Sequence, residues 1–90
     1  MPKKRSSLDI ITDMLASIEE NGGEIKPTHL MYKSNLSHVQ MTSYLEDLMQ
    51  KKAVSRIARK NREYLIITER GKAFLGKLKE MREFSRTFGI

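Results

Sequence analysis

The chain has 90 residues, 39% of them apolar and 31% charged, which is enough for one small domain and too few for two. It contains no cysteine, which excludes disulfide bonds, a thiolate nucleophile and a cysteine-ligated zinc site. The longest apolar run, Tyr64 to Ile67, is far shorter than the roughly 20 residues of a membrane-spanning helix, and residues 1–7 lack the apolar stretch of a signal peptide. We therefore expect a cytoplasmic protein with no membrane partner.

The charge is strongly uneven along the chain. Basic residues number 17 and acidic residues 11, which gives a net charge of +6, and the excess lies entirely after residue 50. A basic stretch without any acidic residue predicts a surface that binds a polyanion, nucleic acid above all, although an ordinary solvated surface is the alternative. The cations of this stretch are Lys51, Lys52, Arg56, Arg59, Lys60 and Arg62.

The first third of the chain predicts two helices. The first is amphipathic, begins after a capping Ser6 or Ser7 and ends at Asn21-Gly22-Gly23. After an extended segment over residues 24–26, Thr28 is expected to cap a short second helix that ends at Ser34-Asn35, with Asn35 in the left-handed conformation. The apolar stripe expected to pack the first helix against a core is Leu8, Ile11, Leu15 and Ile18.

A third helix follows after a very short break. Ser37 and Gln40 have the spacing of a capping box, so the helix is predicted over residues 37–51. Two helices joined by so tight a break indicate a helix-turn-helix. The apolar face of the third helix is predicted to be Met41, Leu45 and Leu48.

The last part of the chain predicts a hairpin and a final helix. Residues 54–58 and 64–67 are β-prone and flank the basic turn Lys60-Asn61-Arg62. Alternation predicts that Ile57, Leu65 and Ile67 point inward and that Arg56 points outward. Thr68 is expected to cap the final helix. Its apolar residues keep helical spacing and are Phe74, Leu78, Met81, Phe84 and Phe88.

The predicted fold class is therefore mainly α with a small β-hairpin. We expect a winged helix-turn-helix DNA-binding domain with a basic N-terminal arm over residues 1–68. A C-terminal amphipathic helix over residues 69–90 is expected to pack on the same domain.

One stretch of the sequence resembles a known family. The run from Thr28 to Ser37, continued by Tyr44-Leu45, Leu48 and Thr68-Glu69-Arg70-Gly71, is similar to small archaeal winged-helix DNA-binding proteins, which include chromatin-associated and transcription-regulator-like factors. The resemblance covers about residues 6–78. It implies a homodimer formed through an antiparallel coiled coil of the C-terminal helix.

The dimerisation residues that this resemblance implies are Phe74, Leu78, Met81, Phe84 and Phe88. Their spacing spans about two and a half heptads, fewer than the three or four that indicate a coiled coil independently. A short dimer helix, another dimer geometry and a monomer therefore all stay open.

The third helix is the predicted recognition helix, because the second helix of such a motif lies in the major groove and contacts bases through its N-terminal residues. Ser37 and Gln40 also have capping roles that compete with base contact. No arginine lies on this face, so the sequence predicts modest specificity or recognition of DNA shape. The candidate base-contacting residues are Ser37, His38, Val39, Gln40, Thr42 and Ser43.

Affinity is expected to come from phosphate contacts. The hairpin is predicted to contact the backbone or the minor groove through Arg56, Arg59, Lys60 and Arg62. Lys33 and the arm Lys3-Lys4-Arg5 are further candidates, the alternative for the arm being a solubilising terminus.

No motif indicates catalysis. His29 and His38 lack the spacing of metal ligands, and no phosphate-cradling loop or nucleophile elbow occurs, so we expect a non-enzyme without cofactor, metal or small-molecule ligand.

The predicted function is double-stranded DNA binding, as a transcription regulator or a chromatin-like, nucleoid-associated factor. The alternative is a winged-helix adaptor that binds an acidic protein, with Tyr32, Tyr44 and the C-terminal aromatic residues in contact. Structured RNA is a weaker candidate, because a helix does not fit the narrow A-form major groove.

Overall fold

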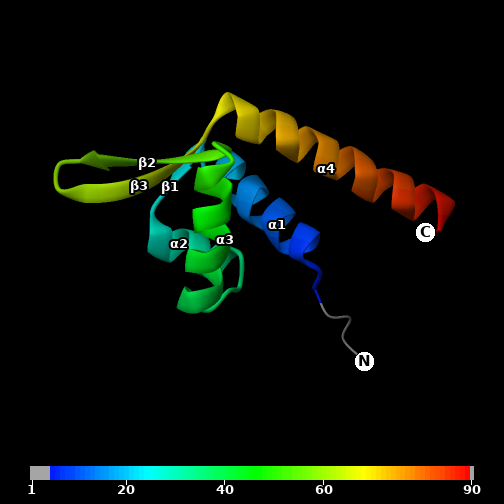
Figure 1. Ribbon diagram of the computed structural model, residues 1–90, viewed down its shortest axis with the longest axis horizontal. Coiled ribbons are helices and arrows are strands. Elements are labelled where there is room, and N and C mark those ends of the chain that lie inside the picture. Colours follow the sequence, from blue (N-terminus) through cyan, green and yellow to red (C-terminus); the bar gives the residue numbers. More distant parts are fainter. Residues whose placement is uncertain (1–4, 90) are drawn as a thin grey trace.

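The computed structural model of the chain describes residues 5–89 and shows four helices and a three-stranded sheet over these residues (Figure 1). The predicted fold class is confirmed, whereas the predicted arm residues Lys3 and Lys4 lie outside the described residues. No helix of the described part is long and apolar enough to cross a membrane. The elements are α1 (Ser7–Glu20), β1 (Glu24–Ile25), α2 (Pro27–Lys33), α3 (His38–Gln50), β2 (Val54–Arg59), β3 (Arg62–Ile67) and α4 (Glu69–Phe88).

The ends of α1 follow from local chemistry. Ser6 is the N-cap: its hydroxyl accepts from the Asp9 amide at 3.1 Å, and the Asp9 carboxylate accepts from the Ser6 amide at 3.2 Å, which completes a capping box. Gly22 follows the helix with a φ of +81°, a conformation that costs glycine little.

Leu8 departs from the prediction. It is 48% exposed, because it lies in the first turn of α1, beyond the core.

The start of α2 corrects the prediction for Thr28. The N-cap is Lys26, which makes no side-chain capping bond, and Pro27 is the first helical residue. Proline suits this position because its φ is already helical and it has no N–H that would lack a partner. The predicted end is confirmed. Asn35 has a φ of +53°, and the Leu36 amide donates to the Met31 carbonyl at 3.1 Å, which turns the chain into α3.

The sheet has the order β1-β3-β2 and is antiparallel throughout, so the predicted extended segment before α2 contributes a third strand. The predicted orientation of Ile57 is wrong. Ile57 pairs with Tyr64, whereas Arg56 pairs with Leu65, and cross-strand partners share a face. Ile57 therefore lies on the face of the sheet away from the buried Leu65. Arg56, which was predicted to point outward, lies on the core face beside Leu65, with its side chain 51% exposed.

The core lies between α1, α2, α3 and the sheet. Its central side chains are fully buried and come from every one of these elements, so the helices and the sheet share one core. These side chains are Met14, Leu15, Ile18, Ile25, Leu30, Leu48, Val54 and Leu65.

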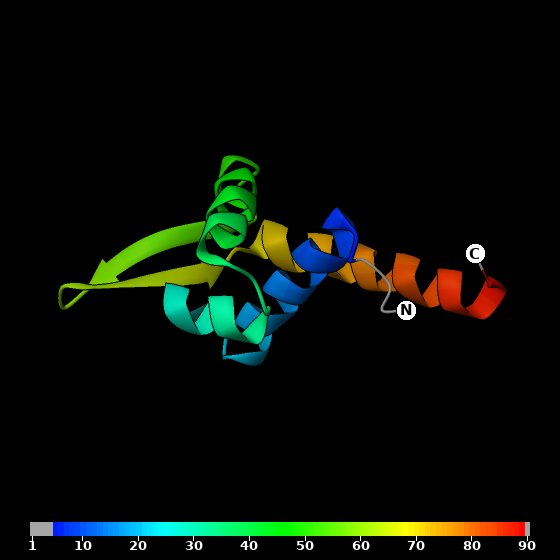
Figure 2. The same cartoon turned by 90° about the horizontal axis from the view of Figure 1, so that it is seen from below.

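α4 contacts the core through its N-terminal half, and Arg82 adds ion pairs to α1. Thr68 is the predicted N-cap, and its hydroxyl accepts from the Gly71 amide at 3.0 Å. Leu75 and Leu78 are buried, whereas the last turns extend past α1 with no other described element beside them (Figures 1 and 2). The wing, defined as residues 54–67, projects from the other side of the helical body (Figures 1 and 2).

Candidate nucleic-acid interface

The N-terminus of α3 is held by its own cap. The Gln40 amide donates to the Ser37 hydroxyl at 3.1 Å, and the Ser37 amide donates to Oε1 of Gln40 at 3.0 Å. The predicted capping box is confirmed. Both side chains remain solvent-exposed, but their oxygen atoms already have partners within the helix.

The outward face of α3 carries small and uncharged groups near its start. Val39 is 77% exposed. The Thr42 hydroxyl donates to the His38 carbonyl at 2.9 Å, one turn earlier in the helix. Glu46 lies at the C-terminal end of this face and was not among the predicted contacts. A shallow depression runs along the face and is lined by His38, Val39, Thr42, Ser43 and Glu46.

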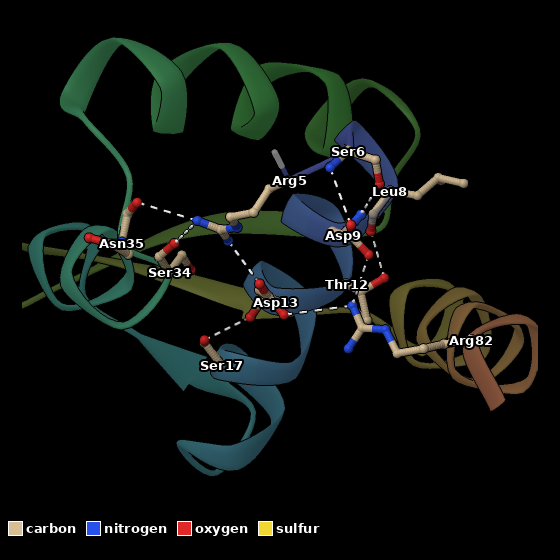
Figure 3. Close-up of polar contacts among 10 residues, drawn as sticks. All are labelled: Arg5, Ser6, Leu8, Asp9, Thr12, Asp13, Ser17, Ser34, Asn35 and Arg82. Carbon is tan, nitrogen blue, oxygen red and sulfur yellow. Dashed lines mark hydrogen bonds and ion pairs between the residues drawn. The ribbon is translucent and has the colours of Figure 1, made fainter. Parts of the chain in front are cut away.

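Arg5 occupies a different place from the predicted flexible arm. Its guanidinium donates through Nη1 to the Ser34 carbonyl at 2.8 Å and through Nη2 to Oδ2 of Asp13 at 2.8 Å (Figure 3). The Ser34 carbonyl lies at the C-terminal end of α2, where helical carbonyls have no partner within the helix. Arg5 therefore ties α1 to the turn between α2 and α3.

Asp13 extends this link toward α4. Its Oδ1 lies 3.8 Å from Nη2 of Arg82, which is also 3.5 Å from Oδ1 of Asp9 (Figure 3). The hydrogen bonds from Ser6, its amide first and then its hydroxyl, together with the charge of Arg82, lower the pKa of the Asp9 carboxyl below its ordinary value. Asp13 is thus paired with an arginine on each side, Arg5 and Arg82.

The four wing cations differ in how much charge they present to a ligand. Nε of Arg56 lies 2.7 Å from Oε1 of Glu63. Arg59 donates to both carboxylate oxygens of Glu24 at 3.1 and 3.2 Å, and its guanidinium lies 5.1 Å from the centre of the Tyr64 ring. The hydrogen bond to Glu24 raises the pKa of Arg59, which is charged at any ordinary pH.

Lys60 and Arg62 are the wing cations that form no ion pair with another residue of 5–89. Lys60 and Asn61 form the two-residue turn, with φ values of +52° and +63°, as in a type I′ hairpin turn. Sequence reasoning treated the four wing cations alike because the acidic partners are distant in sequence or on the facing strand. Glu24 precedes Arg59 by 35 residues.

Lys33 is the remaining predicted phosphate contact. Its ammonium lies 3.7 Å from Oε2 of Glu20, and the lysine side chain is 34% exposed. An exposed pair of this length is weak and opens at little cost, so Lys33 can still reach a ligand.

The predicted dimerisation residues fall into two sets. Phe74 and Leu78 pack against the core of their own domain, while Met81, Phe84 and Phe88 are 56%, 56% and 65% exposed. We call these three exposed residues the apolar strip. The Phe84 and Phe88 rings lie 4.6 Å apart. Leu8, which the sequence assigned to the core, lines a groove with Met81 beside the strip.

A helix-turn-helix with an exposed recognition helix and a β-hairpin wing defines the winged-helix class. A family model described as winged helix-turn-helix matches residues 4–86, and the chain belongs to this family. The predicted relationship is therefore confirmed. No curated relative matches the sequence.

Solved structures share the fold. The chain is similar to Sso10a-2, a DNA-binding protein from Sulfolobus solfataricus, with a TM-score of 0.84 and 23% identity, covering 93% of this chain and 85% of that one. It is similar to a winged-helix DNA-binding protein from STIV, with a TM-score of 0.76 and 16% identity over 89% and 92% of the two chains. It is also similar to the transcriptional regulator BldR from Sulfolobus solfataricus, with a TM-score of 0.76 and 18% identity, covering 88% of this chain and 58% of that one.

Proposed function

We propose that the protein binds double-stranded DNA, with α3 in the major groove and the wing on the flanking backbone or minor groove. The observation that carries the proposal is the exposed N-terminal face of α3, which no other described element covers and whose central side chain, Val39, is 77% exposed. A helix fits the width of the major groove, and N-terminal residues of such a helix meet base edges. The winged-helix neighbours that are named as DNA-binding proteins support the same use of the fold.

The turn of the wing supplies the strongest phosphate contacts. Lys60 and Arg62 have no acidic partner in the part of the chain that the structure describes, whereas Arg56 and Arg59 are already paired with carboxylates. A cation without a partner gains the whole attraction of a phosphate, while a paired cation first gives up an existing bond. Arg62 also suits a narrow minor groove, whose negative potential attracts arginine.

The working form is a homodimer in which the apolar strip meets its counterpart on a second copy. Met81, Phe84 and Phe88 follow one another at spacings of three and four, so they lie on one side of α4. That side is free over the last turns of the helix, and Leu8 continues the apolar surface onto α1. Exposed aromatic side chains that are contiguous in this way are typical of an interface.

We place the protein among low-specificity, architectural DNA-binding factors rather than operator-specific regulators. The recognition face carries no arginine, and the residues best able to make bidentate contacts are engaged in the helix cap. Phosphate contacts then supply most of the binding energy and do not distinguish sequences. An operator-specific regulator would instead prefer its site by a factor of about 10³ or more.

A pair of charge variants tests the proposal. Lys60→Gln with Arg62→Gln removes two free cations, so log K is expected to fall less steeply with log[salt], by about 2 units of slope per subunit. The matched control is Arg56→Gln with Glu63→Gln, which removes an ion pair without changing net charge and is expected to leave the slope unchanged. Equal loss of affinity in both variants, or no loss in either, would contradict the assigned role of the turn.

A further inference from the structure

Several polar atoms on α3 that could distinguish bases are already in use, those of Ser37, Gln40 and Thr42. Oε1 of Gln40 accepts from the backbone amide of Ser37 at 3.0 Å. A bidentate contact with adenine needs both the oxygen and the nitrogen of the Gln40 side-chain amide. The Ser37 hydroxyl accepts from the Gln40 amide, and the Thr42 hydroxyl donates its proton to the His38 carbonyl. A base that competed for these atoms would have to break bonds that hold the helix start together.

Two side chains on this face present methyl groups to solvent, beside the polar groups of His38, Ser43 and Glu46. Val39 exposes 77% of its surface, and Thr42, with its hydroxyl held by the helix backbone, offers its methyl group. Both residues line the same shallow depression, which ends at Glu46. An exposed valine lowers helix stability relative to alanine, since its branched side chain loses rotamer freedom. Val39 makes no contribution to the core that would offset this loss.

We propose that Val39, assisted by Thr42, binds the 5-methyl groups of thymine in the major groove and thereby gives the protein a modest preference for A·T pairs. The inference rests on the proposed function, because it requires α3 to lie in the major groove. Apolar contact with the thymine methyl is one of the few base-specific contacts that needs no hydrogen bond. The Glu46 carboxylate accepts from exocyclic amino groups, N4 of cytosine above all, so the A·T preference is assigned to Val39 and Thr42 alone.

The size of the preference follows from the burial of methyl groups. One buried methyl is worth about 0.8 kcal/mol, which is a factor of about four in affinity, and two give a factor of about fifteen. This preference is far below that of an operator-specific regulator, so it agrees with the low-specificity binding proposed above. Because the thymine methyl lies in the major groove, this preference is independent of contacts that the wing makes with the backbone or the minor groove.

The decisive probe is an alternating A·T duplex of 30 base pairs, compared with the same duplex in which deoxyuridine replaces thymidine. The replacement removes only the 5-methyl group and leaves the minor-groove acceptors as they were, so an A·T preference that came from Lys60 or Arg62 would not respond. An alternating duplex offers only two registers, both made of A·T pairs alone, so no particular binding site has to be known. We expect the thymine duplex to bind at least about fourfold more tightly.

Two variants assign the effect to Val39. Val39→Ala keeps the helix and is expected to reduce the preference for the thymine duplex by about fourfold, to the share that Thr42 contributes. Gly76→Ala, in α4 and with nothing within 4 Å of the added Cβ atom, is expected to keep the thymine preference. Circular dichroism confirms that both variants are folded. A preference of undiminished size in Val39→Ala would overturn the assignment.

A gain of methyl groups provides an independent check. An alternating G·C duplex with 5-methylcytosine places methyl groups at the corresponding position of the major groove, so the wild-type protein is expected to bind it more tightly than the unmethylated duplex. Tight and equal binding to the thymine and deoxyuridine duplexes would overturn the inference and leave the proposed function intact. No binding to any duplex at low salt would overturn both.

Discussion

The start of α4 packs closely against the backbone at Ala53, just before β2, and a substitution at Gly71 tests this contact. Gly71 lies in the first turn of α4, and a Cβ atom there would overlap the Ala53 carbonyl oxygen and lie 2.8 Å from Cγ1 of Ile67. The same carbonyl accepts from the Thr68 amide at 3.1 Å, so it cannot move without weakening the N-cap of α4. Gly71→Ala therefore displaces backbone rather than a flexible side chain.

The expected loss has three parts. Overpacking against backbone costs about 1–3 kcal/mol, and a weakened hydrogen bond costs about 1 kcal/mol more. The better helix propensity of alanine returns up to about 1 kcal/mol. The net effect is a loss of about 2 kcal/mol in the free energy of unfolding, or a Tm lower by roughly 8–16 °C for a chain of this size.

Gly76 is the matched control for this substitution. It lies in the interior of the same helix, and a Cβ atom there would meet no other atom within 4 Å. Gly76→Ala is therefore expected to raise Tm by several degrees, because only the gain in helix propensity remains. Thermal unfolding followed by circular dichroism, at one protein concentration, measures both variants. A rise in Tm for Gly71→Ala equal to that for Gly76→Ala would refute the argument.

Three further predictions concern the ion pairs and the apolar strip. The pKa of Asp9 is lower in the folded state than its ordinary value of 3.8, so the stabilisation by its carboxylate is present above that value and is lost as the pH falls through it toward the folded pKa. The stability difference between wild type and Asp9→Asn should shrink in chemical unfolding experiments below pH 3.8, and a difference that does not change with pH would contradict this. Arg5→Ala is expected to lower the free energy of unfolding by about 1 kcal/mol, since its bonds are partly exposed, and a double-mutant cycle with Asp13→Ala should show coupling between the two residues; additive losses would contradict the link. Phe84→Glu is expected to convert a dimer to a folded monomer in light scattering, whereas unchanged mass would contradict the role of the apolar strip.

Local chemistry explains why much of the fold is predictable from the sequence. The Ser37 and Gln40 capping box, the left-handed Asn35 and the Thr68 cap each depend on residues within a few positions of one another. Thr28 was misassigned because two adjacent residues both suit a helix start, and the preference of proline for the first helical position prevails. The orientation of Ile57 failed for a related reason. The strands run farther toward the turn than predicted, and the pairing register determines which residues share a face.

The candidate site was harder to predict, because its charges are sorted by contacts between distant segments. Arg5 reaches the Ser34 carbonyl across 29 positions, and Arg59 reaches Glu24 across 35. No periodicity reports such pairs, so the sequence could identify a basic wing but could not separate its paired cations from its free ones. Leu8 has helical spacing with the core residues of α1 and yet lies beside the exposed part of α4. Exposure of that kind depends on where a neighbouring helix ends.

The central claim is that this winged helix binds double-stranded DNA through phosphate contacts of low sequence dependence. The most direct test is the affinity of the wild-type protein for two 30-base-pair duplexes of unrelated sequence across a salt series, with the mass of the complex measured by light scattering. The two free cations of each wing turn predict that log K falls with log[salt] at a slope of about −4 or steeper for a dimer, with affinities for the two duplexes within about tenfold. A slope near zero, or no binding at low salt, would contradict the account.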